Sequence, residues 1–488
     1  MALGTKKIDY EKELQARNKT IAQQAARITQ QAERITQLEA EVEKSNSEIE
    51  QLKKLLSGKA ESKTAKKPEF TENYSFDRKK RKKKRRKKST GRRSHHAKRD
   101  MIEKEHAVYR DGVARHKQVF HREQFAWRFI EGKAVYICYK IYDLPDSTQL
   151  PLPAGLRTSR SEFGIEIILT LAFLHYWIGI SIDNVCETIQ FFTGLKLSKS
   201  QADSLLNQLS ADWNEQYDAI AQLIALSMLV YIDETGWKVG KRSCYTWAFS
   251  TAMHVLFRCG VGRGKAEAQK ILGEYFSGIG VTDNYGAYTS LFTKHQLCWA
   301  HLICKAIKLA LQNPDVPQYA AFLDALCDIY HEAVRCSRDS RLSIGRAKKA
   351  CELQDMIRSL CAEHNKTIVD NVTADHETTF IRLQNELIDN LNCLFVFVEH
   401  PEVEPTNNRS ERNVRREAEI RKGGRTSKTS AGAKRRSIIM TVLASLQTRF
   451  AKFTLDNLLS EIQRWREQGC SIFELELTGL QNANAPPT

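Results

Sequence analysis

Three acidic residues, Asp233, Asp283 and Glu411, stand at positions where carboxylates could hold metal ions. Asp233 directly follows the apolar run 228–232, and Asp283 comes soon after the apolar segment 279–281. Phosphodiester transfer uses two Mg²⁺ ions about 3.5–4 Å apart, one activating the attacking oxygen and one stabilising the leaving oxygen. Hard cations prefer carboxylate oxygens. The acids therefore predict a site for two Mg²⁺ ions, which Mn²⁺ can replace, although a lone aspartate after a strand is more often a cap or turn residue.

The segments around the first two acids predict a sheet that brings them together. Apolar runs predict strands at 228–232, 244–251, 254–259 and 279–281, with a helix over 265–276 before the last of them. An acid follows the first strand and the fourth. This order is typical of a ribonuclease-H-like sheet, in which those two strands are neighbours. We therefore expect Asp233 and Asp283 within reach of one metal ion.

The third acid is expected on a helix. Pro405, Asn407 and Asn408 precede Glu411 and are helix-start signals, so Glu411 should lie in the first turn. Taken alone, an acid there would simply complement the helix N-terminus. The intervening residues 303–398 predict an all-helical insertion between the sheet and this helix.

Four short motifs surround these acids in order along the chain. They are DETGW at 233–237, DNYGAY at 283–288, CWAHL at 298–302 and NNRSER at 407–412. Together they resemble the first-acid, second-acid, C-x-x-H and third-acid motifs of the insertion-sequence-66 transposase family. The upstream layout of the chain also fits that family, so the resemblance covers nearly its whole length.

The resemblance implies a DDE-type transposase with a ribonuclease-H-like catalytic domain. Such an enzyme cleaves the ends of its element in a Mg²⁺-dependent reaction and joins the freed 3′-hydroxyl to target DNA. It also implies that Cys298 and His301 support the site, with His301 as a catalytic residue at the scissile phosphate, and that accessory proteins of the same element take part. Two alternatives stay open: a non-catalytic DNA-binding or assembly protein, and a metal-dependent nuclease without strand transfer.

Cysteine and histidine spacing does not predict structural zinc. His295, Cys298, His301 and Cys304 recur every three residues, but three residues turn a helix by about 300°, so four such side chains drift around its axis. Members of the insertion-sequence-66 family, which the motifs resemble, usually carry a cysteine zinc module after the basic linker. Residues 101–160 hold a single cysteine, Cys138, and cannot supply four zinc ligands.

The N-terminal residues predict a coiled coil. Apolar residues recur every seventh position without a miss: Leu14, Ile21, Ile28, Ile35, Val42, Ile49 and Leu56. A seam this regular favours a coiled coil over 1–57 and hence a homo-oligomer. A single long helix packed on its own chain is the alternative.

The net charge of +17 is concentrated in one segment. Residues 78–99 hold 15 Lys or Arg and no acid, which leaves 60 basic and 58 acidic residues elsewhere. Such a run attracts the phosphates of double-stranded DNA regardless of sequence, unless it is only a solvated tail. We assign DNA binding to its first nine residues: Arg78, Lys79, Lys80, Arg81, Lys82, Lys83, Lys84, Arg85 and Arg86. A second basic strip follows Glu411: Arg412, Arg415, Arg416, Arg421, Lys422 and Arg425.

These patterns predict a multidomain α+β chain. A basic linker (58–100) follows the coiled coil, then a small β-hairpin module (101–160) with Gly132 at the turn, and a helical region (161–226) with a candidate helix-turn-helix around Gly194. The catalytic domain combines 227–302 with 399–465, and 466–488 is a tail. Scattered cysteines and an apolar stretch at 163–182 interrupted by Glu166 and His175 predict a cytoplasmic protein without membrane contact. The family resemblance implies association with the bacterial nucleoid.

Overall fold

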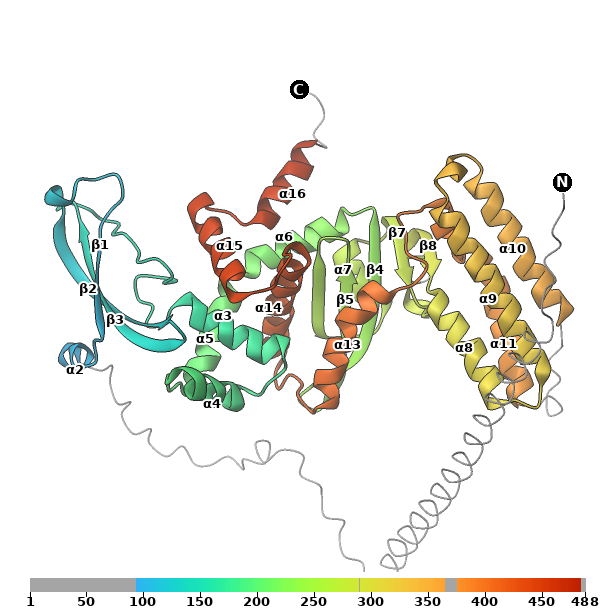
Figure 1. The fold of residues 1–488 in the computed structure, drawn as a ribbon, viewed down its shortest axis with the longest axis horizontal. Coiled ribbons are helices and arrows are strands. Elements are labelled where there is room, and N and C mark those ends of the chain that lie inside the picture. Colours follow the sequence, from blue (N-terminus) through green and yellow to red (C-terminus); the bar gives the residue numbers. More distant parts are fainter. Residues whose placement is uncertain (1–93, 289, 365–374, 484–488) are drawn as a thin grey trace, which may run out of the picture. The chain divides into compact units, whose positions relative to one another are not determined.

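A computed structural model describes residues 94–288, 290–364 and 375–483. The predicted coiled coil and the basic run 78–86 lie outside the described residues. The described chain is mixed α/β, with a three-stranded and a five-stranded sheet among many helices (Figure 1).

The first sheet contains the predicted hairpin. Strands β2 (Val119–Ile130) and β3 (Lys133–Asp143) pair antiparallel. Glu131 and Gly132, with φ of 50° and 77°, form the two-residue turn that suits the twist of such a hairpin. A third strand, β1 (Lys104–Val108), pairs parallel with β3 and was not predicted. Its sequence KEHAV is exposed and has no apolar alternation from which a strand could be inferred. The short helix α2 (His95–Arg99) precedes this sheet.

The region 161–226 is helical, as predicted. Its elements are α3 (Ile165–Ala172), the π-helical turn η2 (Phe173–Trp177), α4 (Ile182–Thr193), α5 (Lys199–Asp212) and α6 (Asn214–Ala225). Gly194 ends α4 in the left-handed conformation, and Ser198 opens α5 with a capping box to Gln201. The apolar stretch 163–182 is thus divided among several turns. None of the described helices is both long and apolar enough to cross a membrane.

The five-stranded sheet has the order β6-β5-β4-β7-β8. Strands β4 and β5 pair antiparallel, as do β5 and β6, whereas β4, β7 and β8 run parallel. The neighbouring positions of β4 and β7 agree with the prediction. The strands are β4 (Leu229–Val239), β5 (Arg242–Ser250), β6 (Val255–Val261), β7 (Phe276–Thr282) and β8 (Phe292–Leu297), with helix α7 (Lys265–Leu272) between β6 and β7.

Two predicted boundaries in this sheet are wrong. The first strand does not end before Asp233 but continues to Val239, because residues 233–239 pair with β5 as far as the turn at Gly240. The predicted helix 265–276 ends at Leu272, because Gly273 has a positive φ of 84° and the chain turns there into β7.

Helix α14 (Ser430–Arg449) covers the edge of the sheet at β6. Ser437, Thr441 and Ser445 are spaced one turn apart, and their hydroxyls accept the N–H groups of Cys259, Phe257 and Val255 at 2.9, 2.9 and 3.0 Å. Four helical residues rise about 6 Å and two strand residues about 6.6 Å, so the two spacings match. The edge strand therefore has its hydrogen bonds satisfied without another strand.

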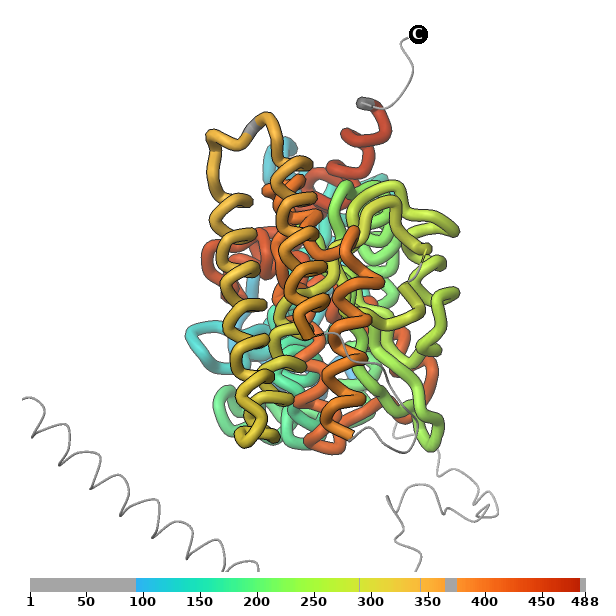
Figure 2. Tube along the Cα trace, turned by 90° about the vertical axis from the view of Figure 1, so that its right-hand side faces the viewer, coloured from blue at the N-terminus to red at the C-terminus, as the bar shows by residue number. Residues whose placement is uncertain are grey.

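The predicted insertion folds as a helical bundle (Figures 1 and 2), and its core continues onto one face of the sheet. Gold and orange tubes in Figure 2 mark its long helices, which lie side by side. They are α8 (Trp299–Gln312), α9 (Pro317–Arg338), α10 (Arg346–Glu363) and α11 (Asp375–Asp389), followed by the short α12 (Val396–Glu399). The chain then enters α13 (Asn408–Lys422), which carries Glu411, and after α14 ends in α15 (Leu455–Gln468) and α16 (Ile472–Ala483).

The sheet separates two cores. Val230 and Ile232 of β4 belong to the core that includes α3 to α6 and α14. Tyr231 belongs to the core shared with the bundle, as do Ile279 and Val281 of β7. Because side chains alternate along a strand, successive residues of β4 face opposite cores.

Candidate active site

Asp233 and Asp283 occupy matching positions on neighbouring parallel strands. Tyr231 is in register with Val281, and each aspartate follows two residues later, on the same face of the sheet. Each also accepts a hydrogen bond from a backbone N–H that follows it, Glu234 to Asp233 at 2.8 Å and Tyr285 to Asp283 at 3.2 Å. The two carboxylates therefore have fixed orientations beside each other.

Glu411 approaches from the first turn of α13, which packs against β4 and β5. Asn407 is the N-cap residue and Glu411 lies in the first turn, as predicted, although the Asn407 side chain makes no capping hydrogen bond among the described residues. Its amide donates instead to the carbonyl of Ile232 at 2.7 Å. Asn407 thus fixes the start of α13 against the residue immediately before Asp233.

Burial and neighbouring charges both act on the ionisation of Asp233. The pKa of Asp233 is raised to about 8, first by burial and then by the nearby carboxylate of Glu234, with further contributions from Asp283 and Glu411. Like charges at short range disfavour ionisation, and a bound cation would reverse this effect. Carboxylates grouped just beyond the point where β4 and β7 stop pairing are suited to divalent cations with oxygen ligands.

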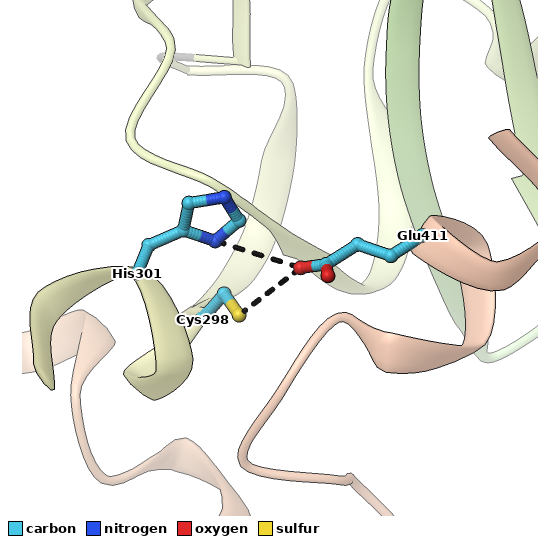
Figure 3. A group of neighbouring side chains, drawn as sticks. All are labelled: Cys298, His301 and Glu411. Carbon is cyan, nitrogen blue, oxygen red and sulfur yellow. Dashed lines mark hydrogen bonds and ion pairs between the residues drawn. The ribbon is translucent and has the colours of Figure 1, made fainter. Parts of the chain in front are cut away.

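Cys298 and His301 also lie beside Glu411 (Figure 3). The Oε1 atom of Glu411 is 3.6 Å from the Nδ1 of His301 and 3.7 Å from the Sγ of Cys298. Cys298 is the buried N-cap residue of α8, and burial raises its pKa to about 11. His295 and Cys304, the other two residues of the three-residue repeat, point elsewhere. His295 contacts the Thr282 hydroxyl at 2.7 Å, and Cys304 is exposed.

Glu234 is a feature of the site that the sequence prediction missed. It lies on the opposite face from Asp233, where the Tyr288 hydroxyl donates to it at 2.5 Å and Arg263 at 3.0 Å. The Arg263 guanidinium stacks over the Tyr285 ring at 4.0 Å. The DETGW and DNYGAY motifs are therefore joined by side-chain contacts. Strand alternation could have predicted that Glu234 and Asp233 face opposite sides of the sheet. It could not have predicted which side chains contact Glu234.

The basic strip after Glu411 is only partly open to a ligand. Arg412, Arg415 and Lys422 are exposed, and Arg421 is half-buried. Arg416 lies over the Trp177 ring at 3.7 Å and donates to the Trp177 carbonyl, so it ties α13 to the helical region. Arg425 donates to the carbonyl of Gly179.

The fold and these residues define an α/β protein with two aspartates just beyond the parallel pairing of two neighbouring strands. A family model described as the transposase IS66 family matches residues 160–435, which is more than half of the chain. The chain belongs to this transposase family. A search of curated proteins gave no match.

Proposed function

We propose that the protein is a DDE-type DNA transposase that cleaves the ends of an insertion element and transfers the freed strand into target DNA. The observation that carries this proposal is the arrangement of Asp233, Asp283 and Glu411. Asp233 and Asp283 each lie two residues beyond the last parallel pair of β4 and β7, Tyr231 with Val281, and the charge of Glu411 contributes to the raised pKa of Asp233. The sheet order, with three antiparallel strands followed by two parallel ones, supports a ribonuclease-H-like catalytic domain.

The donor set fits magnesium. Asp233, Asp283 and Glu411 would hold the ions, because carboxylates supply the oxygen ligands that Mg²⁺ prefers. When bound, the ions would activate the attacking oxygen and stabilise the leaving oxygen. Asn407 and the backbone N–H groups after each aspartate hold the carboxylates in place for this task. His301, which is exposed beside Glu411, is positioned to contact the scissile phosphate.

DNA is held, in this proposal, by basic residues outside the carboxylate cluster. Arg412, Arg415 and Lys422 are exposed on the helix that carries Glu411, and basic strips of this kind bind the phosphate backbone. The basic run 78–86 adds a second, sequence-independent contact. Arg421 and Arg425 border the same helix, whereas Arg416 acts through its packing on Trp177.

The remaining segments complete the proposed domain plan. The coiled coil 1–57 assembles a homo-oligomer, the linker 58–100 binds DNA, and 101–160 is a β module without structural zinc. Residues 161–226 include the candidate helix-turn-helix, 227–302 with 399–465 form the catalytic domain around the insertion 303–398, and 466–488 form the tail. The enzyme would act at the bacterial nucleoid, together with accessory proteins of its element.

Single substitutions in the triad test the proposal. Asp233→Ala, Asp283→Ala and Glu411→Gln should each lower Mg²⁺-dependent cleavage of element-end DNA by at least about 100-fold, because metal ligation contributes several kcal/mol and each 1.36 kcal/mol is tenfold. Affinity for DNA should change little. Asp355→Ala, on the exposed face of α10, is the matched control and should cleave normally.

Cleavage and joining are scored separately in this assay. Cleavage without joined product would identify a metal-dependent nuclease, and DNA binding without either would identify an assembly protein. Near-normal cleavage by any triad variant would show that its acid is misassigned.

A further inference from the structure

The side chains of Cys298, His301 and Glu411 converge on one point (Figure 3). Their sulfur, imidazole nitrogen and carboxylate oxygen all lie within 4.8 Å of one another. We propose that these three residues form a binding site for a soft divalent ion of the zinc class, and that this ion withdraws Glu411 from the Mg²⁺ pair. The second half of this proposal rests on the proposed function, whereas the first half does not.

The distances at the cluster leave room for an ion: the Cys298 thiol donates a hydrogen bond to Glu411 that an ion would replace, and His301 makes no direct hydrogen bond to Glu411. A hydrogen bond between an imidazole and a carboxylate would span roughly 2.7–3.2 Å, and the His301 to Glu411 separation of 3.6 Å is too long for one. A zinc-class ion binds nitrogen and oxygen at about 2.0–2.1 Å and sulfur at about 2.3 Å, so its tetrahedral ligands stand about 3.3–3.6 Å apart. The separations of 3.6 and 3.7 Å at Glu411 need only a few tenths of an ångström of adjustment.

The ligand types select the class of ion. A thiolate and an imidazole bind zinc-class ions well, whereas Mg²⁺ prefers oxygen. On binding, the Cys298 thiol would give its proton to the solvent and the ion would take its place on sulfur. Three protein ligands leave the fourth position to water, so this is an open site and not a closed structural one.

Surrounding groups are suited to support such an ion. The backbone N–H of Asn407 donates to the Cys298 sulfur at 3.2 Å, the kind of outer bond that orients a metal ligand. The side-chain Oδ1 of the same residue is buried and has no hydrogen-bond partner among the described residues. Cys298 also caps the N-terminus of α8, where a negative sulfur is favoured.

Sharing Glu411 has a functional consequence. The same oxygen, Oε1, faces both Cys298 and His301, so an ion held by these residues would engage the glutamate that the proposed Mg²⁺ site also needs. Zinc-class ions would then inhibit cleavage, and Cys298 and His301 would be the residues that make the enzyme sensitive to them.

Cobalt binding to the full-length, metal-free protein tests the site directly. Titration with Co²⁺ should give the visible absorption of a tetrahedral ion and a near-ultraviolet thiolate-to-cobalt band, and Zn²⁺ should displace both. Loss of outer-shell partners alone changes metal affinity by about 10–100-fold, so Cys298→Ser and His301→Ala should each weaken binding by at least about 100-fold. Cys304→Ser, an exposed cysteine on the same helix, is the matched control and should leave the spectrum unchanged.

Two further arms separate this site from the proposed function. Asp283→Ala should abolish cleavage yet keep the cobalt spectrum, and in the wild type Zn²⁺ at displacing concentrations should lower Mg²⁺-dependent cleavage at least tenfold. A thiolate band that is missing, or that persists in Cys298→Ser, would overturn the site. Uninhibited cleavage at saturating Zn²⁺ would overturn the withdrawal of Glu411. A normal cobalt spectrum in a wild type that never cleaves would instead refute the proposed function alone.

Discussion

At Asp233, burial and neighbouring carboxylates act in the same direction. They raise its pKa from the ordinary 3.8 to about 8. An acid with a raised pKa in the folded state is most favourable when protonated, so its contribution to stability is complete below about pH 3.8 and is lost as the pH rises to about 8. The candidate site therefore costs the metal-free protein stability as the pH rises, and a bound cation would offset this cost.

A pH series of the metal-free protein measures this cost. Asp233→Asn should be increasingly more stable to urea than the wild type as the pH increases from 5 to about 8. The difference in their free energies of unfolding should grow by at most about 1.4 kcal/mol per pH unit. Added Mg²⁺ should stabilise the wild type more at pH 8 than at pH 6, because binding must displace a proton. Parallel pH curves for the two proteins would mean that Asp233 is ionised throughout. Asp355→Asn serves as the exposed control.

At the level of elements, α14 has an unusual task. Its central residues are buried on nearly all sides, and three of its hydroxyl residues accept N–H groups of the edge strand β6. The Ser445 hydroxyl makes two hydrogen bonds to the backbone of Val255. It accepts from the N–H and donates to the carbonyl. A buried ion pair, Arg436 with Glu417, also joins α14 to α13, the helix that carries Glu411. The position of the third acid thus depends on α14.

Removing one hydroxyl should be costly. Ser445→Ala leaves a backbone donor and acceptor unpaired in the core, and we expect a loss of about 1–3 kcal/mol in the free energy of unfolding by urea denaturation. Ser359→Ala, on the exposed face of α10, makes the same chemical change and should be near neutral. Equal stability of the two variants would show that the hydroxyl ladder contributes little.

At the scale of the whole molecule, the segments that precede the described residues carry two separate predictions. The seam of apolar residues in 1–57 predicts self-association. Deleting it, or replacing Ile28 and Ile35 by Asn, should at least halve the mass measured by light scattering. Glu33→Asn, outside the seam, should not change the mass. An unchanged mass after deletion would favour a single long helix instead.

The basic run predicts a strong dependence of DNA affinity on salt. Each neutralised phosphate changes the slope of log affinity against log salt by about 0.9, so deleting 78–99 should flatten the slope by several units for element-end and random DNA alike. An unchanged slope would indicate a solvated tail. A loss confined to end sequences would show that this segment, and not the candidate helix-turn-helix around Gly194, recognises sequence.

Local sequence patterns were sufficient to predict most elements and to mark two aspartates as candidate metal ligands. Apolar runs and turn residues reflect short-range preferences, so the hairpin at Gly132, the helices of 161–226 and the strand leading to Asp233 could be predicted. The motif resemblance supplied Glu411, which no local pattern would have distinguished from an ordinary helix-start acid. The end of β4 was misjudged because its second half is defined by pairing with β5 rather than by hydrophobicity.

The tertiary structure alone decided which side chains meet. Cys298 and Glu411 are 113 residues apart, and their contact depends on the bundle returning the chain to the sheet. Glu234 and Asp233 are adjacent in sequence yet face opposite cores. Which of them contacts Tyr288 and which lies near the other acids depends on how each face of the sheet is packed. The hydroxyls of α14 likewise gain their role from a strand 178 to 190 residues away. Contacts of this kind depend on long-range packing, because the same residues in another register would face different partners.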